Sequence, residues 1–240
     1  GAVTTGVLNT LIGGLAGDAL TDADYNVAVG KSSLTSDTLG SRSTALGTNA
    51  LFSQNFTTAT DTYNVAVGFE AGAAVTTGVK NILIGGLAGD ALTDADFNVA
   101  LGYQALSYDQ LGSNSVAIGH QALATQRFAT ATNSYNTAVG AQAGQEVTTG
   151  ISNTLIGGLA GDAFTDADFN VALGYQALSA DTLGSNNVAI GDAALRAQNF
   201  TTATNAFNVA VGASAGINVT TGINNTLIGG LAGDALTDAD

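Results

Sequence analysis

The chain has 240 residues, with 32 glycines, no proline, cysteine, methionine or tryptophan, and a formal net charge of −14 from 19 acidic and 5 basic residues. The absence of cysteine excludes disulfides, thiol catalysis and thiolate metal sites, and the negative charge disfavours binding to nucleic acid phosphates or anionic lipid. Hydrophobic residues make up 45% of the chain, which argues against disorder, yet no apolar run approaches the ~20 residues of a membrane helix.

The chain is built from nested repeats. The phrase NTLIGGLAGDALTDAD at 9–24 returns at 225–240, with near copies at 81–96 and 153–168. A shorter motif, N-[V/T/I]-[A/L]-[V/I/L]-G, recurs throughout, and we call its closing glycine the rung glycine. The first rung glycines stand at positions 13, 30, 47, 68 and 85, a 17/17/21/17 spacing that recurs along the chain and gives a 72-residue super-repeat. We therefore expect one repetitive segment over 1–240, with super-repeats at approximately 14–85, 86–157 and 158–229 and partial copies at 1–13 and 230–240. The repetition suggests that it is part of a longer chain.

Each repeat unit is too short to form a core alone, so neighbouring units must stack. The apolar run is three residues long, rich in Val and Ile, with Asn before it and Gly after it, which predicts a short strand. The sequence thus predicts an all-β fold, a parallel β-solenoid of 17/17/21/17-residue rungs. The absence of proline fits, because proline would remove a backbone donor from an interior strand.

Residues 98–102, NVALG, illustrate one predicted rung. Alternation along the strand places Val99 and Leu101 on one face, where we expect them to fill the interior, and Asn98 and Ala100 on the other. A flat alanine face would let a second chain approach closely, which favours an oligomer around a shared axis. Asn suits local and rung-to-rung hydrogen bonds, and the rung glycine suits positive φ or tight packing. The predicted structural ladder includes Asn26, Val27, Val29, Gly30, Asn98, Val99, Leu101, Gly102, Asn170, Val171, Leu173 and Gly174.

Chemical sites are not evident in the repeats. The one histidine, His120, follows a rung glycine, where we expect an exposed loop residue, and no G-x-S-x-G motif occurs. A catalytic site should break the repeat pattern once, and no rung does. We therefore expect neither enzymatic activity nor a cofactor.

Calcium binding is an alternative interpretation of one acidic loop. GGLAGDAL at 13–20 nearly matches the calcium-binding solenoid repeat, and Asp18, Asp22 and Asp24 lie close together in sequence. Three carboxylates could hold this hard cation. We instead expect a solvated acidic turn.

Aromatic residues occupy fixed places. Tyr103 and Tyr175 follow rung glycines, where we expect them to be exposed and able to contact a glycan or protein. A second set directly precedes the rung asparagine, and its fixed place predicts packing at a corner. This set is Tyr25, Tyr63, Phe97, Tyr135, Phe169 and Phe207.

Two resemblances emerge from these motifs. NSVAIGHQALA at 114–124 and SNNVAIGDAAL at 185–195 resemble the head repeats of trimeric autotransporter adhesins. NVALGYQAL at 98–106 and NTAVGAQAG at 136–144 resemble repeats of bacteriophage tail fibres, notably those of marine and cyanobacterial phages. Both resemblances imply a homotrimeric fibre, with a single-chain solenoid as the alternative. The rungs are longer than those of adhesin heads, and the 72-residue super-repeat fits the tail-fibre resemblance better.

The resemblance implies the structural shaft of an extracellular fibre. We expect this shaft to belong to a phage tail fibre or virion appendage, located on the virion. It would contact other virion or fibre proteins and present a host-recognition tip. The alternative is an adhesin-type surface protein, extracellular or on the cell surface, whose repeats bind a host cell-surface glycan or protein receptor directly. No nucleic acid or membrane partner is expected.

Overall fold

A computed structural model describes residues 3–239, and these residues form strands and turns with no helix. They divide into two compact units, residues 3–115 with 127–132 and residues 116–126 with 133–239. No described segment forms a helix with the length and hydrophobicity needed to cross a bilayer.

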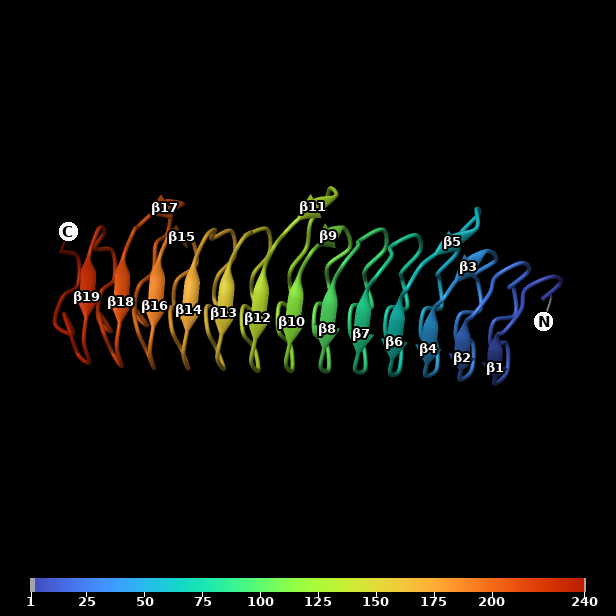
Figure 1. Cartoon of the computed structure of the whole chain (residues 1–240). Coiled ribbons are helices and arrows are strands. Elements are labelled where there is room, and N and C mark those ends of the chain that lie inside the picture. The colour runs from blue at the N-terminus through green and yellow to red at the C-terminus, as the bar shows by residue number, and fades with distance from the viewer. Residues whose placement is uncertain (1–2, 240) are drawn as a thin grey trace. The chain divides into compact units, whose positions relative to one another are not determined.

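Each unit is a parallel β-solenoid with one three-residue strand per rung (Figure 1). The first unit contains β1 (Thr10–Ile12), β2 (Val27–Val29), β4 (Thr44–Leu46), β6 (Val65–Val67), β7 (Ile82–Ile84) and β8 (Val99–Leu101). The second contains β10 (Val116–Ile118), β12 (Thr137–Val139), β13 (Thr154–Ile156), β14 (Val171–Leu173), β16 (Val188–Ile190), β18 (Val209–Val211) and β19 (Thr226–Ile228).

The strands pair in parallel at the spacing of the rung glycines. In the first unit Thr10 lies opposite Val27 across a shorter step, and Thr44 lies opposite Val65 across the longer step. The second unit repeats this order, since β10 and β12 pair across the longer step and the next three pairs are joined by shorter ones. The predicted all-β parallel solenoid of 17/17/21/17-residue rungs is therefore confirmed.

The 21-residue rungs carry short accessory strands at their inserted segments. β3 (Gly40–Ser41) pairs with β5 (Thr60–Asp61) in the first unit, and β15 (Gly184–Ser185) pairs with β17 (Thr204–Asn205) in the second. β9 (Gly112–Ser113) and β11 (Thr132–Asn133) stand at the corresponding places of the middle super-repeat. The insertion thus adds a local ladder without disturbing the register of the main strands.

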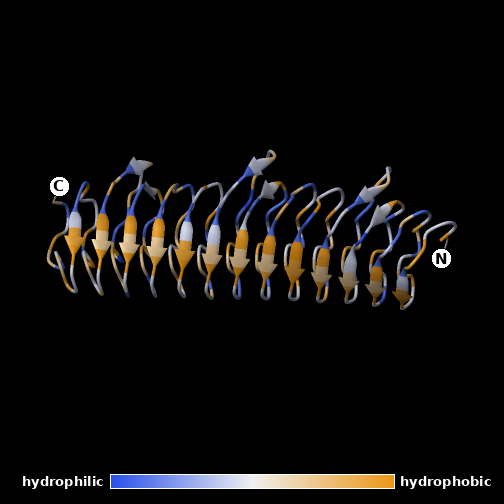
Figure 2. Cartoon of the chain, viewed as in Figure 1, coloured by the Kyte–Doolittle hydropathy of each residue, from blue (hydrophilic) through white to orange (hydrophobic). Residues whose placement is uncertain are grey.

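The direction of the strand side chains is opposite to the predicted one. Asn98 and Ala100 are fully buried, whereas Leu101 is 42% exposed and Val99 is half-buried. The same holds in β2 and β14, where Ala28 and Ala172 are buried. The prediction that Val99 and Leu101 fill the interior is wrong, and the alanine face is no surface for a second chain. The outward side chains are instead Val, Ile, Leu and Thr, and Figure 2 shows that most strands are coloured hydrophobic.

Limited space inside each turn explains this direction. The residue four places after the rung glycine is either a fully buried leucine, such as Leu51 or Leu106, or a glycine. Where it is leucine, only alanine fits at the middle of the strand. Where the strand carries Leu83 instead, the facing positions are Gly72 and Gly89, and a Cβ added at either would lie 2.7 Å from a Leu83 methyl group. The repeated phrase LIGGLAGDAL therefore combines a large leucine in the strand with small glycines at the positions that face it in the core.

Candidate functional site

The buried asparagines form the polar part of the ladder. Asn98 N–H donates to Asn81 Oδ1 at 2.9 Å, Asn98 Nδ2 donates to Gly112 O at 2.9 Å, and Asn98 Oδ1 accepts the Ser115 N–H at 2.9 Å. Asn26 and Asn170 have the same pattern of partners. The predicted rung-to-rung bonding of this column is present, and its role is structural because these buried polar atoms are used in bonds within the stack.

The rung glycines have the backbone conformation predicted for them. φ is 135° at Gly30, 140° at Gly102 and 145° at Gly174. At Gly30, an added Cβ would also lie 2.5 Å from Gly47 O of the next rung. Both positive φ and close backbone packing therefore require glycine here.

A second buried polar cluster was not predicted. Asp37 is fully buried, and its carboxylate accepts the Gly40 N–H at 3.0 Å, the Phe56 N–H at 3.1 Å and Gln54 Nε2 at 2.6 Å. Gln54 also donates to Ser43 Oγ at 2.8 Å and accepts from Asn64 Nδ2 at 2.9 Å. The recurring D-T-L-G-S at 37–41 and 181–185, with a glutamine one rung after each Asp, could have identified it.

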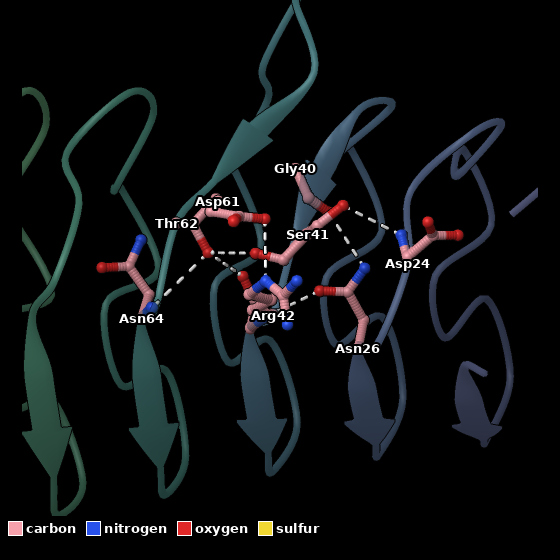
Figure 3. A network of polar contacts seen from close by, with 9 residues as sticks. Asp24, Asn26, Gly40, Ser41, Arg42, Asp61, Thr62 and Asn64 are labelled. Carbon is pink, nitrogen blue, oxygen red and sulfur yellow. Dashed lines mark hydrogen bonds and ion pairs between the residues drawn. The ribbon is translucent and has the colours of Figure 1, made fainter. Parts of the chain in front are cut away.

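The network around the first 21-residue rung continues from this cluster (Figure 3). Ser43 and Thr62 hydroxyls lie 2.6 Å apart, and Asp24 N–H donates to Ser41 Oγ at 2.9 Å. At the edge of this network, Arg42 Nε pairs with Asp61 Oδ1 at 2.9 Å. These contacts tie the inserted segment to its neighbours and leave no open catalytic arrangement among them.

The carboxylates of the candidate calcium loop do not converge. Asp22 accepts from Thr5 Oγ1 at 2.5 Å and Asp24 Oδ1 accepts the Val7 N–H at 2.7 Å, both from the preceding rung, while Asp18 is exposed. Within the part of the chain that the structure describes, no group of three or more His, Asp or Glu residues could hold a metal ion. Asp22 and Asp24 are acceptors in rung-to-rung bonds, and the equivalent Asp94, Asp96, Asp166 and Asp168 have the same role.

Asp90 is the acidic residue with the most altered proton affinity. It lines a surface depression of about 350 Å³ together with Glu70 and Asn49, and its Oδ1 is buried without a hydrogen-bond partner. Burial raises the pKa of Asp90 from 3.8 to about 6, and the nearby Glu70 charge adds to the rise. Asp162, one super-repeat later, also has an unpartnered buried Oδ1 and a pKa raised by burial and then by Glu146. Since both units carry the feature, it belongs to the repeat and is not a unique catalytic centre.

The aromatic residues for which the sequence predicted a position lie on the surface. His120, Tyr103 and Tyr175 are exposed as predicted. The six rings that precede the rung asparagines are 47% to 58% exposed, so they are not packed away from solvent. They form a regular surface row just before the strands.

The outward strand face is repeated on every rung of both units. Its side chains in each unit are Val, Ile, Leu and Thr, with no charged residue. Several are substantially exposed, namely Ile12, Val27, Leu46, Ile82, Leu101, Ile156, Leu173 and Ile228. A face in contact with water usually carries polar side chains, and contiguous exposed apolar surface marks an interaction site.

In comparisons with known proteins, no protein-family model and no curated protein matches the chain. Its function is therefore inferred from the surfaces of the molecule itself.

Proposed function

We propose that the chain is a shaft segment of an extracellular fibre, of the phage tail-fibre or virion-appendage type, in which several copies associate side by side. The observation that carries this proposal is the outward strand face, which is largely apolar, uncharged and at least partly exposed on every rung of both units. In a single chain this face would lie in water, and a second copy would cover it with the same surface. Three copies is the number that the resemblance to fibre and adhesin repeats implies.

Repetition supports a mechanical role. Each added rung extends the stack by about 4.8 Å while preserving the same contacts to its neighbours. The shaft would then hold a host-recognition tip away from the virion and join other virion or fibre proteins at its ends.

The test measures the mass of the undenatured 240-residue chain by light scattering over a range of concentrations. We expect a trimer, and we expect Leu101→Lys combined with Leu173→Lys to shift the mass towards a single chain, because two charges would be buried at each interface. The matched control places the same charges on exposed turns, with Gln110→Lys and Asn199→Lys, and should leave the trimer intact. A wild-type chain that stays monomeric at all concentrations contradicts the proposal.

A chelator adds a second arm to this experiment. Because Asp22 and Asp24 already accept bonds from the preceding rung, removal of divalent metal should leave the mass unchanged. Dissociation on chelation would instead support an ion-dependent assembly.

The second candidate function is direct adhesion by the repeats. Tyr103 and Tyr175 occupy the same position in successive super-repeats and are 51% and 55% exposed. Exposed aromatic residues of this kind suit contacts with a glycan or protein receptor. Binding of this segment alone to host cells, lost on replacing both tyrosines by serine, would favour adhesion over a purely structural shaft.

A further inference from the structure

A row of alternating aromatic and polar residues follows the corner just before the strands. In the first unit it runs Tyr25, Arg42, Tyr63, Lys80, Phe97 on successive rungs, and in the second it runs Tyr135, Ser152, Phe169, Asn186, Phe207. All ten residues have a left-handed backbone, with φ between 50° and 65°. The side chains of each row therefore leave the coil in the same manner, and a ring stands on every second rung.

In the first unit, cations from the intervening rungs lie against the rings. Arg42 Cζ is 4.7 Å from the centroid of Tyr25 and 5.9 Å from that of Tyr63, and Asp61 holds the guanidinium (Figure 3). Lys80 Nζ is 5.0 Å from the centroid of Phe97. These are cation–π distances, so each space between two rings, which we call a slot, contains a positive charge from the chain itself.

The second unit repeats the Lys80 slot without the lysine. The Lys80 slot is flanked by Tyr63 and Phe97, and the Ser152 slot is flanked by Tyr135 and Phe169, the same two residue types. The chain therefore contains two slots with matched walls, one with a cation and one with a hydroxymethyl group.

The backbone contacts around the two slots are also the same. Lys80 N–H donates to Thr62 O at 2.7 Å and Phe97 N–H donates to Val79 O at 3.1 Å. Ser152 N–H donates to Ser134 O at 2.7 Å and Phe169 N–H donates to Ile151 O at 3.1 Å. The backbone around the slot is thus the same in both units, and only the side chain between the rings differs, Lys80 in the first and Ser152 in the second.

Ring exposure reflects this difference. Tyr63 and Phe97 are each 49% exposed, whereas Tyr135 is 58% and Phe169 is 55% exposed. The serine side chain is too short to cover the rings as a lysine stem does. The faces of Tyr135 and Phe169 are therefore more accessible than those of their counterparts.

Charge favours a positive occupant for the Ser152 slot. Of the five basic residues, Lys31, Arg42, Lys80 and Arg127 lie in the first unit, and Arg196 alone lies in the second. Asp166 and Asp168 lie within three residues before Phe169, and Asp168 Oδ1 accepts the Ile151 N–H at 2.7 Å beside Ser152. A cation entering this slot in the way that Lys80 enters its own would meet the Phe169 ring and a negative local field.

We propose that the Ser152 slot binds the ammonium group of a lysine on a partner protein, in the way that the Lys80 slot holds its own lysine. Two rungs further on, Asn186 lies between Phe169 and Phe207 and donates to Asn205 Oδ1 at 2.9 Å, in the place where Arg42 pairs with Asp61. Slots two rungs apart are separated by about 10 Å, which an extended chain spans in about three residues. The partner segment is therefore a lysine-bearing segment of the form Lys-x-x-Lys in the polyproline II conformation, which has three residues per turn and presents both lysines on one face.

This site is independent of the proposed self-association. It uses residues at the corner before the strand and none of the side chains on the outward strand face. Loss of the trimer and loss of lysine binding can therefore be observed separately.

The test uses a dye-labelled, end-blocked peptide, Gly-Gly-Lys-Gly-Gly-Lys-Gly-Gly, and follows its fluorescence anisotropy with the full chain at low ionic strength. We expect saturable binding that weakens as salt rises, and no binding of the same peptide with norleucine in place of lysine. Equal binding of the norleucine peptide would overturn the proposal.

Two substitutions locate the site. Ser152→Lys should fill the slot and weaken binding by about fivefold, the equivalent of the ~1 kcal/mol of an exposed cation–π contact. Asn199→Lys adds the same charge at an exposed position outside the row and should have a smaller effect. Equal effects of the two would show a response to net charge alone and would overturn the assignment.

The reverse substitution provides a gain of function. Lys80→Ser opens a slot with the same walls in the first unit, and it should raise the number of peptides bound per chain from one to two. Thermal melting of each variant checks that the fold is retained. An unchanged stoichiometry in a folded Lys80→Ser variant would also overturn the proposal.

Discussion

Asn170 illustrates what one buried side chain contributes to the stack. Its Nδ2 donates to Gly184 O at 2.9 Å, and its Oδ1 accepts the Asn187 N–H at 2.9 Å. These bonds satisfy backbone groups that no solvent reaches, because both asparagines are fully buried. The side chain therefore replaces part of the backbone pairing that the turn cannot provide.

Replacing Asn170 by alanine should lower the free energy of unfolding by roughly 2–5 kcal/mol, since a buried N–H and a buried C=O each lose a partner. Chemical denaturation measures the change. Asn199→Ala is the matched control, because Asn199 is exposed and its Oδ1 accepts a single bond from Thr182 at 3.1 Å. Similar losses in the two variants would contradict the role assigned to the buried column.

Asp90 makes stability depend on pH in an unusual direction. Because burial raises its pKa to about 6 in the folded chain from 3.8, the folded state holds the proton more tightly than the unfolded state. The stability that this proton provides is complete below about pH 4 and is lost as pH rises through about 6.

Asp90→Asn should therefore flatten the loss of stability between about pH 4 and 6 and should make the chain more stable than wild type at neutral pH. Thermal melting across this range measures both effects. The raised pKa values of Asp162 and Asp168 leave part of the slope in place. An identical slope in wild type and variant would show that Asp90 titrates normally.

At the scale of one strand, the size of the middle strand residue limits the size of the residues that face it in the core. Leu83 of β7 lies against Gly72 and Gly89, whereas the next rung combines Ala100 in the strand with a fully buried Leu106 four places after the rung glycine. The pattern has the same origin as any close-packed interior, in which added or missing volume is costly.

Leu83→Ala should cost about 2–5 kcal/mol of stability, because the facing glycines cannot fill the cavity. Gly89→Ala should also destabilise, since its φ is +56° and the new Cβ would meet Leu83 at 2.7 Å. Denaturant unfolding of the double variant is informative: relief of the clash should make the combined loss smaller than the sum of the single losses. Additive losses would contradict direct packing between these positions.

At the scale of the whole molecule, repetition allows the length of the solenoid to change in steps of one super-repeat. The rung after Gly85 begins with Gly86, and the equivalent residue one super-repeat later is Gly158. Stability of such an array is a sum of repeats and of contacts between neighbours.

Deleting residues 86–157 should therefore leave a folded chain, because Gly85 is joined to a residue of the same kind and the register is retained. Deleting 86–155 should lower the stability, because the new 19-residue rung has its two extra residues directly after Gly85, where the backbone packs closely against the next rung. Circular dichroism and cooperative melting distinguish the two. Equal stability of both deletions would show that this position tolerates an insertion.

The periodicity of the sequence was sufficient to predict the architecture and part of the structural ladder. Spacing of the rung glycines predicted the strand positions, the parallel pairing and the longer third rung, because a stacked repeat must place equivalent residues in register. The Asn and Gly columns were likewise predictable, since their conformational preferences are local.

Tertiary structure alone decided which face of each strand points inward. Alternation separates Val99 and Leu101 from Ala100, but it does not say which set is buried when both are apolar. That choice depends on how much room Leu106 and its equivalents leave on the other side of the turn, which is a contact between positions distant along the rung. The same limit applies to the aromatic row and to the Asp22 and Asp24 carboxylates, whose partners stand on neighbouring rungs. Composition and spacing determined that this chain stacks, while the width of the interior determined which surfaces it presents.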